Sequence, residues 1–273
     1  MAIHHLNCGT LCPYSARLVN GDGGWLEKGR MVCHCLLIES SDGLVLVDTG
    51  FGTGDVLDPG RLGRATSLLI RPEPAETETA VERVRAAGLD PGDVRHVVVT
   101  HLDLDHAGGL GDFPDAEVHL TVAEHEVAMD PPPAERPRYV SAHWAHGPRW
   151  RTHTGGGDRW FGFESVRVLP GVDPEIALVP LHGHSRGHAM VAIRDGEGWV
   201  LHCGDAYFHR AEMEIPYRCP PALRAFQRLN ASDYGERSRN QDRLRELARD
   251  RGDEIELFCS HDPVELERLA GVP

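Results

Sequence analysis

The fold is decided by one stretch of the sequence, Thr100-His101-Leu102-Asp103-Leu104-Asp105-His106-Ala107-Gly108-Gly109, which follows directly on an apolar run. Two histidines and two aspartates fall within six positions of a loop that leaves a buried strand, and the strand can hold their side chains toward one point. Imidazole and carboxylate groups together suit Zn, Mn or Fe, and the lack of cysteine argues against a closed structural zinc finger. The stretch therefore predicts a catalytic metal site.

Three later segments carry further histidines and aspartates in an order that completes such a site. They are Leu181 to His188 (L-H-G-H-S-R-G-H), Leu201 to Ala206 (L-H-C-G-D-A) and Phe258 to Asp262 (F-C-S-H-D). Each segment alone is compatible with an ordinary polar turn, whereas four in this order form a specific pattern. With them the chain resembles the metallo-β-lactamase superfamily, whose first motif reads H-x-H-x-D-H and is followed by a lone His, an Asp and a final His. The resemblance runs from Val32 to the C-terminus and is closest to the lactonase-like branch.

This resemblance implies a centre with two divalent metal ions. Position by position, it assigns to the first metal site His101, Asp103 and His184, to the second Asp105, His106 and His261, and to the bridge between them Asp205. Zinc is the favoured metal. Where the family usually has a second His this chain has Asp103, and a carboxylate is a harder ligand than imidazole, so Mn or Fe is the alternative. The occupancy of the first site stays open.

The resemblance also gives roles to residues around the metals. Asp48, in a D-T-G that ends an early strand, is expected to support the metal loop, with a plain turn residue as the alternative. His188 is expected to brace its own loop by hydrogen bonding. Asp105 is expected to orient the attacking hydroxide and to carry its proton. Tyr207 is expected to hydrogen-bond the developing oxyanion, with simple packing as the alternative, because in the lactonases the comparable tyrosine lies where this chain has Phe208. Phe208 is assigned to the substrate pocket.

Apolar patterning predicts two groups of strands. Strands are expected at residues 32–38, 44–47, 94–100 and 117–120, and again at 165–169, 176–179, 189–193, 199–202 and 255–259. Helices are expected at 76–87 and 241–251. Such grouping fits two sheets packed face to face and covered by helices. This is the αββα sandwich of two mixed β-sheets that the resemblance implies, an α+β fold in a single domain over residues 1–273.

The segment from Met129 to Trp150 interrupts this pattern. It opens with Asp130 and three prolines, so a regular element is not expected there. A long irregular insertion in a compact domain is usually functional or disordered. We predict a lid over the metals that contributes Tyr139 and Trp144 to the substrate pocket. A satellite cluster on the surface is the alternative.

Composition limits the partners. A formal net charge of −14 and a sequence pI of about 5.6 disfavour nucleic acid. We find neither a signal-peptide pattern nor an apolar run of membrane-spanning length, so a cytoplasmic protein that does not bind membranes is expected. Seven cysteines without a secretory signal are interpreted as reduced thiols. A homodimer stays open.

These features predict a metal-dependent hydrolase that acts on a small-molecule substrate. A metal-bound hydroxide would open an ester-like bond, with a lactone favoured. One alternative is a diiron oxygenase or redox enzyme on the same fold, which Asp103 suggests; another is a hydrolase of thioesters or phosphoesters. A metal-poor binding protein that has kept the fold is the third alternative, and near-stoichiometric metal would count against it.

Overall fold

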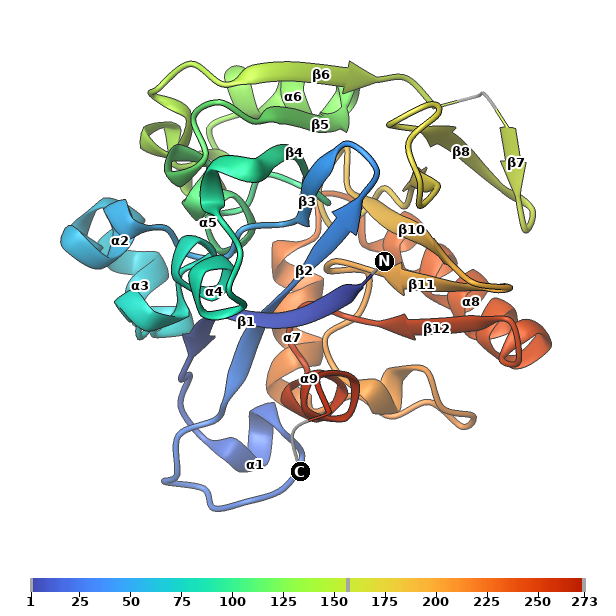
Figure 1. Ribbon diagram of the computed structural model, residues 1–273. Coiled ribbons are helices and arrows are strands. Elements are labelled where there is room, and N and C mark those ends of the chain that lie inside the picture. Colours follow the sequence, from blue (N-terminus) through green and yellow to red (C-terminus); the bar gives the residue numbers. More distant parts are fainter. Residues whose placement is uncertain (1, 156–157, 272–273) are drawn as a thin grey trace.

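The computed structural model describes residues 2–155 and 158–271, whose strands form two β-sheets (Figure 1). The strands of the first sheet are β1 (Ile3–Leu11), β2 (Met31–Ser40), β3 (Gly43–Val47), β4 (Val94–Val98), β5 (Glu117–Thr121) and β6 (Arg149–His153). The strands of the second are β7 (Asp158–Trp160), β8 (Phe163–Arg167), β9 (Ile176–Pro180), β10 (Ala189–Asp195), β11 (Gly198–His202) and β12 (Ile255–Phe258). In both sheets neighbouring strands follow the order of the sequence, so β1 and β6 are the edges of the first sheet and β7 and β12 are the edges of the second.

Each sheet mixes parallel and antiparallel pairs. In the first sheet β1, β2 and β3 pair antiparallel, and β3 to β6 run parallel. In the second sheet the parallel pair is β11 with β12. The sheets meet through apolar side chains, with Leu36 and Val45 of the first sheet in one buried cluster with Leu178 and Val191 of the second. Burial of each such side chain stabilises the folded state by about 1.5–3 kcal/mol relative to leaving it exposed to solvent.

Helices cover the two outer faces. The α-helices are α1 (Ala16–Val19), α2 (Thr53–Leu57), α3 (Arg64–Ile70), α4 (Ala80–Ala86), α5 (Leu104–Ala107), α6 (Val122–Met129), α7 (Pro221–Asn230), α8 (Tyr234–Arg251) and α9 (Pro263–Leu269). Short 3₁₀ turns lie at Pro59–Leu62, Glu76–Glu78, Pro91–Asp93, Gly108–Asp112, Arg136–Arg138, Ser141–Trp144 and Arg210–Glu212. Val84 of α4 packs in one cluster with Leu46 of the first sheet, and Leu244 of α8 packs in another with Met190 of the second. The predicted αββα sandwich is confirmed.

Some elements differ from the prediction. The helix expected at 76–87 begins as a 3₁₀ turn, and its α-helical part is α4. The helix expected at 241–251 is the second half of α8, which begins at Tyr234 because the carboxylate of Asp233 accepts a hydrogen bond from the Glu236 amide at 2.8 Å. β1 and α7 were not predicted, and β1 gave little signal because its side chains are mostly half-buried rather than alternating. Within the described ranges, we find no helix with the length and apolar character to cross a membrane.

Candidate metal centre

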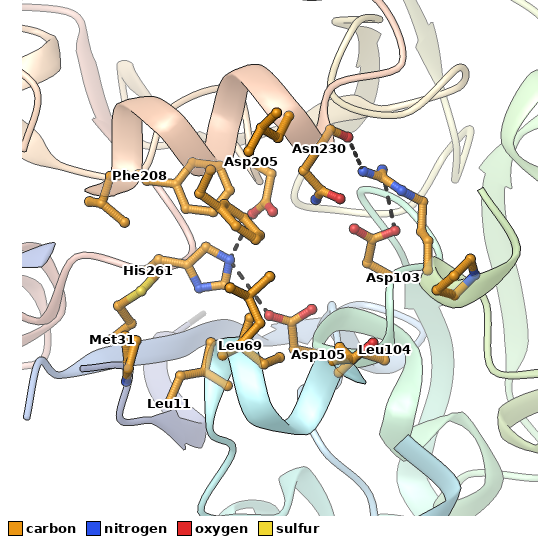
Figure 2. A pocket seen from close by; sticks show the side chains of 18 of the residues that line it. Leu11, Met31, Leu69, Asp103, Leu104, Asp105, Asp205, Phe208, Asn230 and His261 are labelled. Atoms are coloured by element: carbon orange, nitrogen blue, oxygen red, sulfur yellow. Dashed lines mark hydrogen bonds and ion pairs between the residues drawn. The ribbon is translucent and has the colours of Figure 1, made fainter. Parts of the chain in front are cut away.

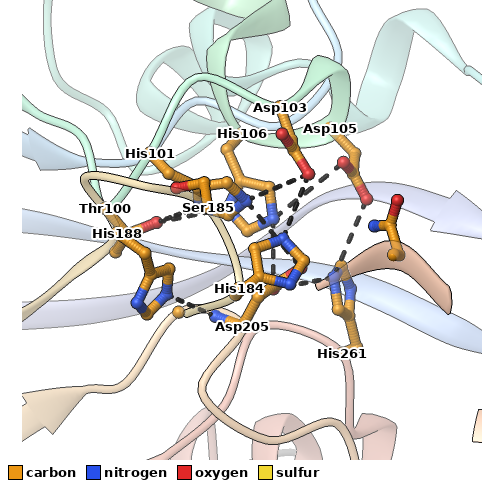
Figure 3. Close-up of polar contacts among 12 residues, drawn as sticks. Thr100, His101, Asp103, Asp105, His106, His184, Ser185, His188, Asp205 and His261 are labelled. Carbon is orange, nitrogen blue, oxygen red and sulfur yellow. Dashed lines mark hydrogen bonds and ion pairs between the residues drawn. The ribbon is translucent and has the colours of Figure 1, made fainter. Parts of the chain in front are cut away.

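The loops that follow the strands bring the seven predicted ligands together (Figure 3). They form two groups, each with ligand atoms within 4.8 Å of one another: His101, Asp103, His184 and Asp205 in one, and Asp105, His106 and His261 in the other. The two oxygens of Asp205 connect the groups. Its Oδ1 lies 3.3 Å from His106 Nε2 and 3.0 Å from His261 Nε2, while its Oδ2 lies 3.3 Å from His184 Nε2. Asp205 therefore lies where a residue shared by two ions is needed.

The donor atoms of this cluster fit divalent cations. The Nε2 atoms of His101 and His106 are buried and have no hydrogen-bond partner among the described residues, and the same holds for Oδ1 of Asp103 and of Asp205. A buried polar atom without a partner costs about 1–3 kcal/mol. Three carboxylates and four imidazoles also gather here, all of them buried except the partly exposed Asp105, and such a concentration of negative charge needs compensating cations. The residues present therefore fit a site for two dications.

For His101, His184 and Asp205, electrostatics favours the protonation states that ligands require. Burial lowers the pKa of His101 and of His184 well below the ordinary value, so both imidazoles are neutral. Burial alone would raise the pKa of Asp205, but His261 and His106 outweigh it and hold this pKa well below the usual range. Asp205 is therefore a carboxylate. Neutral imidazole and ionised carboxylate are the forms that bind metal.

Asp48 orients the metal loop from behind. Its carboxylate accepts hydrogen bonds from the Thr100 amide at 2.7 Å, from the Thr100 hydroxyl at 2.8 Å and from His106 Nδ1 at 2.8 Å. His261 is held in the same way, because its Nδ1 donates to the carbonyl of Val32 at 2.8 Å. With Nδ1 engaged, the Nε2 atom of each ring is turned toward the cluster.

His188 uses both of its ring nitrogens outside the cluster. Nδ1 donates to the carbonyl of Leu181 at 2.9 Å, and Nε2 accepts from the Asp205 amide at 2.9 Å. Gly204 makes this contact feasible, since a Cβ there would lie 2.5 Å from His188 Nε2 and the backbone φ is +55°. His188 thus braces the loop that carries Asp205 as well as its own.

Glu124, on α6, connects the first metal loop to the loop of His184 and was not found from the sequence. Its buried carboxylate accepts from the Leu102 amide at 3.0 Å, from the Ser185 hydroxyl at 2.6 Å and from the Gly187 amide at 3.1 Å. Burial raises its pKa. A single glutamate on a short helix resembles a surface residue in the sequence, so only the three-dimensional structure identifies it.

Arg138 is the second residue that sequence reasoning missed. Its Nη1 lies 3.4 Å from Asp103 Oδ1, and the guanidinium donates to the carbonyls of His184 at 3.2 Å and Asn230 at 2.6 Å. Burial would raise the pKa of Asp103, but Arg138 and His101 lower it below its usual value. The unusual carboxylate at position 103 is therefore accompanied by a buried cation.

The cluster forms the floor of a cavity of about 740 Å³ (Figure 2). Asp103, Asp105, Asp205 and His261 line it on one side. Its walls are largely apolar and include Leu11, Met31, Leu69, Leu104, Phe208, Leu223, Phe226 and Leu229. Phe208 was assigned to the pocket and does line it, with its ring stacked on that of His261 at a centroid distance of 4.9 Å.

Tyr207 does not reach this cavity, so the oxyanion role predicted for it is wrong. Its side chain is fully buried in the core between the second sheet and α8. Its hydroxyl donates to Glu265 at 2.9 Å. Neighbouring residues point to opposite sides of the chain here, so Phe208 enters the cavity and Tyr207 turns away from it.

The insertion contributes to the cavity through other residues than the ones predicted. Ala134, Glu135, Pro137 and Arg138 line the cavity. Tyr139 instead packs in the core outside the first sheet, and its hydroxyl donates to Glu124 at 3.4 Å.

The second predicted pocket residue of the insertion, Trp144, is partly buried and also lies away from the cavity. Trp144 packs against the same buried cluster, next to His143, whose Nε2 lies 2.9 Å from Asp55 Oδ1 of α2. The aromatic side chains therefore anchor the insertion to the domain, and their assignment to the substrate pocket is wrong. Its last two residues, Arg149 and Trp150, begin β6, so this end is regular after all.

Comparison with known proteins identifies the family to which the sequence is similar. A model of the metallo-β-lactamase superfamily matches residues 29–259. A probable metallo-hydrolase from Mycobacterium tuberculosis is 43% identical over 269 residues, which cover 98% of this chain and 82% of that protein. An N-acyl homoserine lactonase from Bacillus thuringiensis is 28% identical over 187 residues, which cover 67% of this chain and 68% of the lactonase.

Solved structures show the same fold. A crystal structure of the lactonase AiiA from Bacillus thuringiensis with N-decanoyl-L-homoserine bound at the active site superposes with a TM-score of 0.73 at 22% identity, over 97% of this chain and 95% of the other. An N-acyl homoserine lactone hydrolase with the product N-hexanoyl-L-homoserine at its catalytic metal centre gives the same TM-score at 23% identity and the same coverage. At such identities the likeness concerns the fold.

Proposed function

Since the chain belongs to the metallo-β-lactamase superfamily and is a metallo-hydrolase of that kind, we propose that it opens an ester bond, a lactone above all, in a substrate with an apolar chain. One observation carries this proposal: the cluster of carboxylates and imidazoles is the floor of a largely apolar cavity of about 740 Å³. A concave, apolar site with a few convergent polar groups is the usual form of a small-molecule site. The lactonase relatives act on substrates of this chemical class.

The chain's own residues divide into ligands and supports. The first ion would be held by His101, Asp103 and His184, the second by Asp105, His106 and His261, and both by Asp205. When bound, two such ions would lower the pKa of a water molecule toward about 7 and polarise a carbonyl oxygen. Zinc is the metal we favour, with Mn or Fe as the alternative at the first site because of Asp103.

Asp105 is the residue we assign to proton transfer. Its Oδ2 lies 3.7 Å from His261 Nε2, and the side chain lines the cavity (Figure 2). A carboxylate in this place can orient the attacking water, accept its proton and return that proton to the leaving oxygen. Phe208 and the apolar walls would hold the substrate chain and keep water away from the floor.

A substrate panel with continuous measurement of acid release tests this function. The protein, reconstituted with Zn or Mn, is given lactones and linear esters of increasing chain length, thioesters and phosphoesters. We expect turnover of lactones first and esters second, with kcat/KM rising with chain length. The Asp105→Asn variant is expected to lose turnover together with part of its metal, since Asp105 is also a ligand of the second site. Turnover restricted to phosphoesters or thioesters would refute the lactone assignment.

Asp103 supports one second candidate, an iron-dependent redox enzyme. A carboxylate at this position makes the first group of ligands harder, which suits iron. Iron retained through purification, together with oxygen consumption and no acid release, would favour this candidate over the hydrolase.

A further inference from the structure

Three strands of the first sheet carry a second cluster of histidines. In β4, His96 lies two positions before Val98, whose side chain packs between the sheets, so the two share that inner face. In β5, Glu117 and His119 alternate with Val118, which packs on the outer face, and His96 is the register partner of Glu117. The strands lie side by side at one end of the sheet, where β6 is the edge (Figure 1).

Their side chains converge on one point. Ligand atoms of His96, Glu117 and His119 all lie within 4.8 Å of one another. The contact at the centre joins His96 Nδ1 and His119 Nε2 at 3.1 Å. This separation is close to the roughly 3.3 Å expected between two nitrogen ligands of a tetrahedral ion with metal–nitrogen bonds of about 2.0–2.1 Å.

The other nitrogen of each central imidazole has a partner of its own. His96 Nε2 lies 3.4 Å from Asp42 Oδ2, and His119 Nδ1 lies 3.1 Å from His153 Nε2. A carboxylate only accepts, so Asp42 favours the tautomer of His96 that leaves Nδ1 with a lone pair. If Nε2 of His153 likewise accepts a hydrogen bond from His119 Nδ1, then Nε2 of His119 also carries a lone pair and not a proton. Two facing lone pairs repel each other unless a cation lies between them.

Charge and burial also suit a cation. His96 and His119 are buried, and burial together with His96 and His153 lowers the pKa of His119 to about 3, so its imidazole is neutral. The hydrogen bond from Arg151 lowers the pKa of Glu117, which is therefore ionised. The Glu117 side chain is 26% exposed, which leaves an entry path from solvent.

We propose that His96, His119 and Glu117 form a binding site for a divalent transition-metal ion such as Zn²⁺, separate from the catalytic centre. Two imidazoles and one carboxylate are a ligand set that such ions use, with water completing the coordination. Asp42 and His153 orient the ligating rings, as hydrogen-bond partners of metal-bound histidines do. The ion connects β4 to β5 and, through His153, to β6, the strand in which the chain returns from the insertion.

Metal stoichiometry tests this site. Protein stripped with a chelator is dialysed to equilibrium against buffered Zn²⁺, and bound metal is measured by elemental analysis. The wild type is expected to bind one equivalent more than His96→Gln or His119→Gln, and to show a rise in Tm on binding it that these variants lack. His4→Gln is the matched control, because His4 is a partly exposed imidazole paired with Glu39 outside both clusters. It should bind as the wild type does.

Two further variants keep the result decisive. Glu117→Gln leaves the buried imidazoles in place and should weaken the additional equivalent at least tenfold, even if the histidine variants fold poorly. Asp205→Ala should lose catalytic metal and retain the additional equivalent, which separates this proposal from the proposed function. Equal stoichiometry in wild type, His96→Gln and His119→Gln, or unchanged affinity in Glu117→Gln, would overturn the site and leave a hydrogen-bonded histidine chain, with His119 donating to His96.

Discussion

The floor and the walls of the cavity are built in different ways. On the floor, the rings of His106 and His261 are fixed by hydrogen bonds at 2.8 Å, which their Nδ1 atoms donate to a carboxylate and to a backbone carbonyl, respectively. Part of the walls consists of apolar side chains that still face solvent, since Leu69 of α3 is 62% exposed and Leu229 of α7 is 87% exposed. The floor is therefore rigid and the walls are adaptable.

This difference separates chemistry from substrate choice. Residues that hold reacting groups must stay within a fraction of an ångström of their productive positions, so hydrogen bonds from both sheets hold them. Apolar walls on short helices can change shape without disturbing these bonds. The Arg138 guanidinium connects the floor to the walls, because Arg138 belongs to the insertion and its side chain lies beside Asp103 of the floor. Substitutions at the floor should therefore have the largest effect on the enzyme, substitutions at the contact between Arg138 and Asp103 a smaller one, and substitutions at the walls the smallest.

The largest effect is expected from breaking the floor. Asp205→Ala removes the carboxylate shared by both groups of ligands, and His106→Ala removes one ligand of the second. Each should lower turnover by roughly 10³-fold or more and reduce bound metal, because the remaining charges lose their compensation. His182→Gln, two residues from His184, is the control and should keep metal and activity. Full activity with unchanged metal in either alanine variant would refute the site.

The contact between floor and wall should show the next largest effect. Asp103→His restores the usual family ligand but leaves the buried Arg138 without its counter-charge, and breaking a buried ion pair costs about 3–5 kcal/mol. The double variant Asp103→His/Arg138→Gln should regain most of this loss. Urea unfolding of the two single variants and the double variant measures the coupling. Only the double variant is expected to shift metal preference cleanly toward Zn. If the changes in the free energy of unfolding of the two single variants simply add up in the double variant, Arg138 does not support Asp103.

Beneath the floor lies the carboxyl group of Glu265, and we expect it to make the free energy of unfolding depend on pH. Its carboxyl accepts from the Tyr207 hydroxyl at 2.9 Å and the Cys259 amide at 2.8 Å, and burial raises its pKa from 4.5 to about 7. The folded state therefore keeps a proton that the unfolded state loses first. The stabilisation is fully present below pH 4.5 and is lost as the pH rises toward 7, by up to about 3 kcal/mol.

Urea unfolding at pH 5 and pH 8 checks this sign. Glu265→Gln is neutral at both values, so its stability relative to the wild type should rise with pH. Glu256→Gln, an exposed glutamine variant in β12, is the control and should follow the wild type. A constant difference between Glu265→Gln and the wild type would mean that Glu265 is ionised throughout.

The floor was predictable from the sequence because its ligands lie in short motifs at the ends of strands. Because these motifs stand in the order that the superfamily shows, the resemblance was enough to assign His101 to His106 and the later histidines to one cluster, and the structure brings them together. The supports were not predictable, because Glu124 and Arg138 have no motif and act through contacts between segments far apart in the sequence. Such residues resemble surface charges until the fold brings them inside.

The direction in which a side chain points was the other feature that could not be predicted from the sequence. Tyr207 and Phe208 are adjacent, and the sequence did not show which of them enters the cavity, because the turn at Gly204 sets the direction of the chain that follows. Arg138 and Tyr139 present the same difficulty in the insertion, where the charged residue faces the cavity and the aromatic one packs in the core. Polarity alone would suggest the opposite arrangement.

The smallest effect is expected at the walls. Leu69→Ala and Leu229→Ala remove apolar surface that only a bound substrate chain would cover, so each should weaken kcat/KM for long-chain substrates by about 1 kcal/mol, or roughly fivefold. Short-chain substrates, metal content and Tm should stay unchanged, because the side chains are largely exposed. A panel of lactones that differ only in chain length measures this selectivity.

Trp144→Ala is the matched comparison, since Trp144 belongs to the insertion but packs against the core. It should lower Tm and reduce kcat/KM by the same factor at every chain length, because a side chain packed against the core supports the whole site and contacts no substrate. Loss that grows with chain length in Trp144→Ala, and not in Leu69→Ala, would reverse the assignment. The aromatic side chains of the insertion would then cover the substrate, and α3 would not contact the substrate chain.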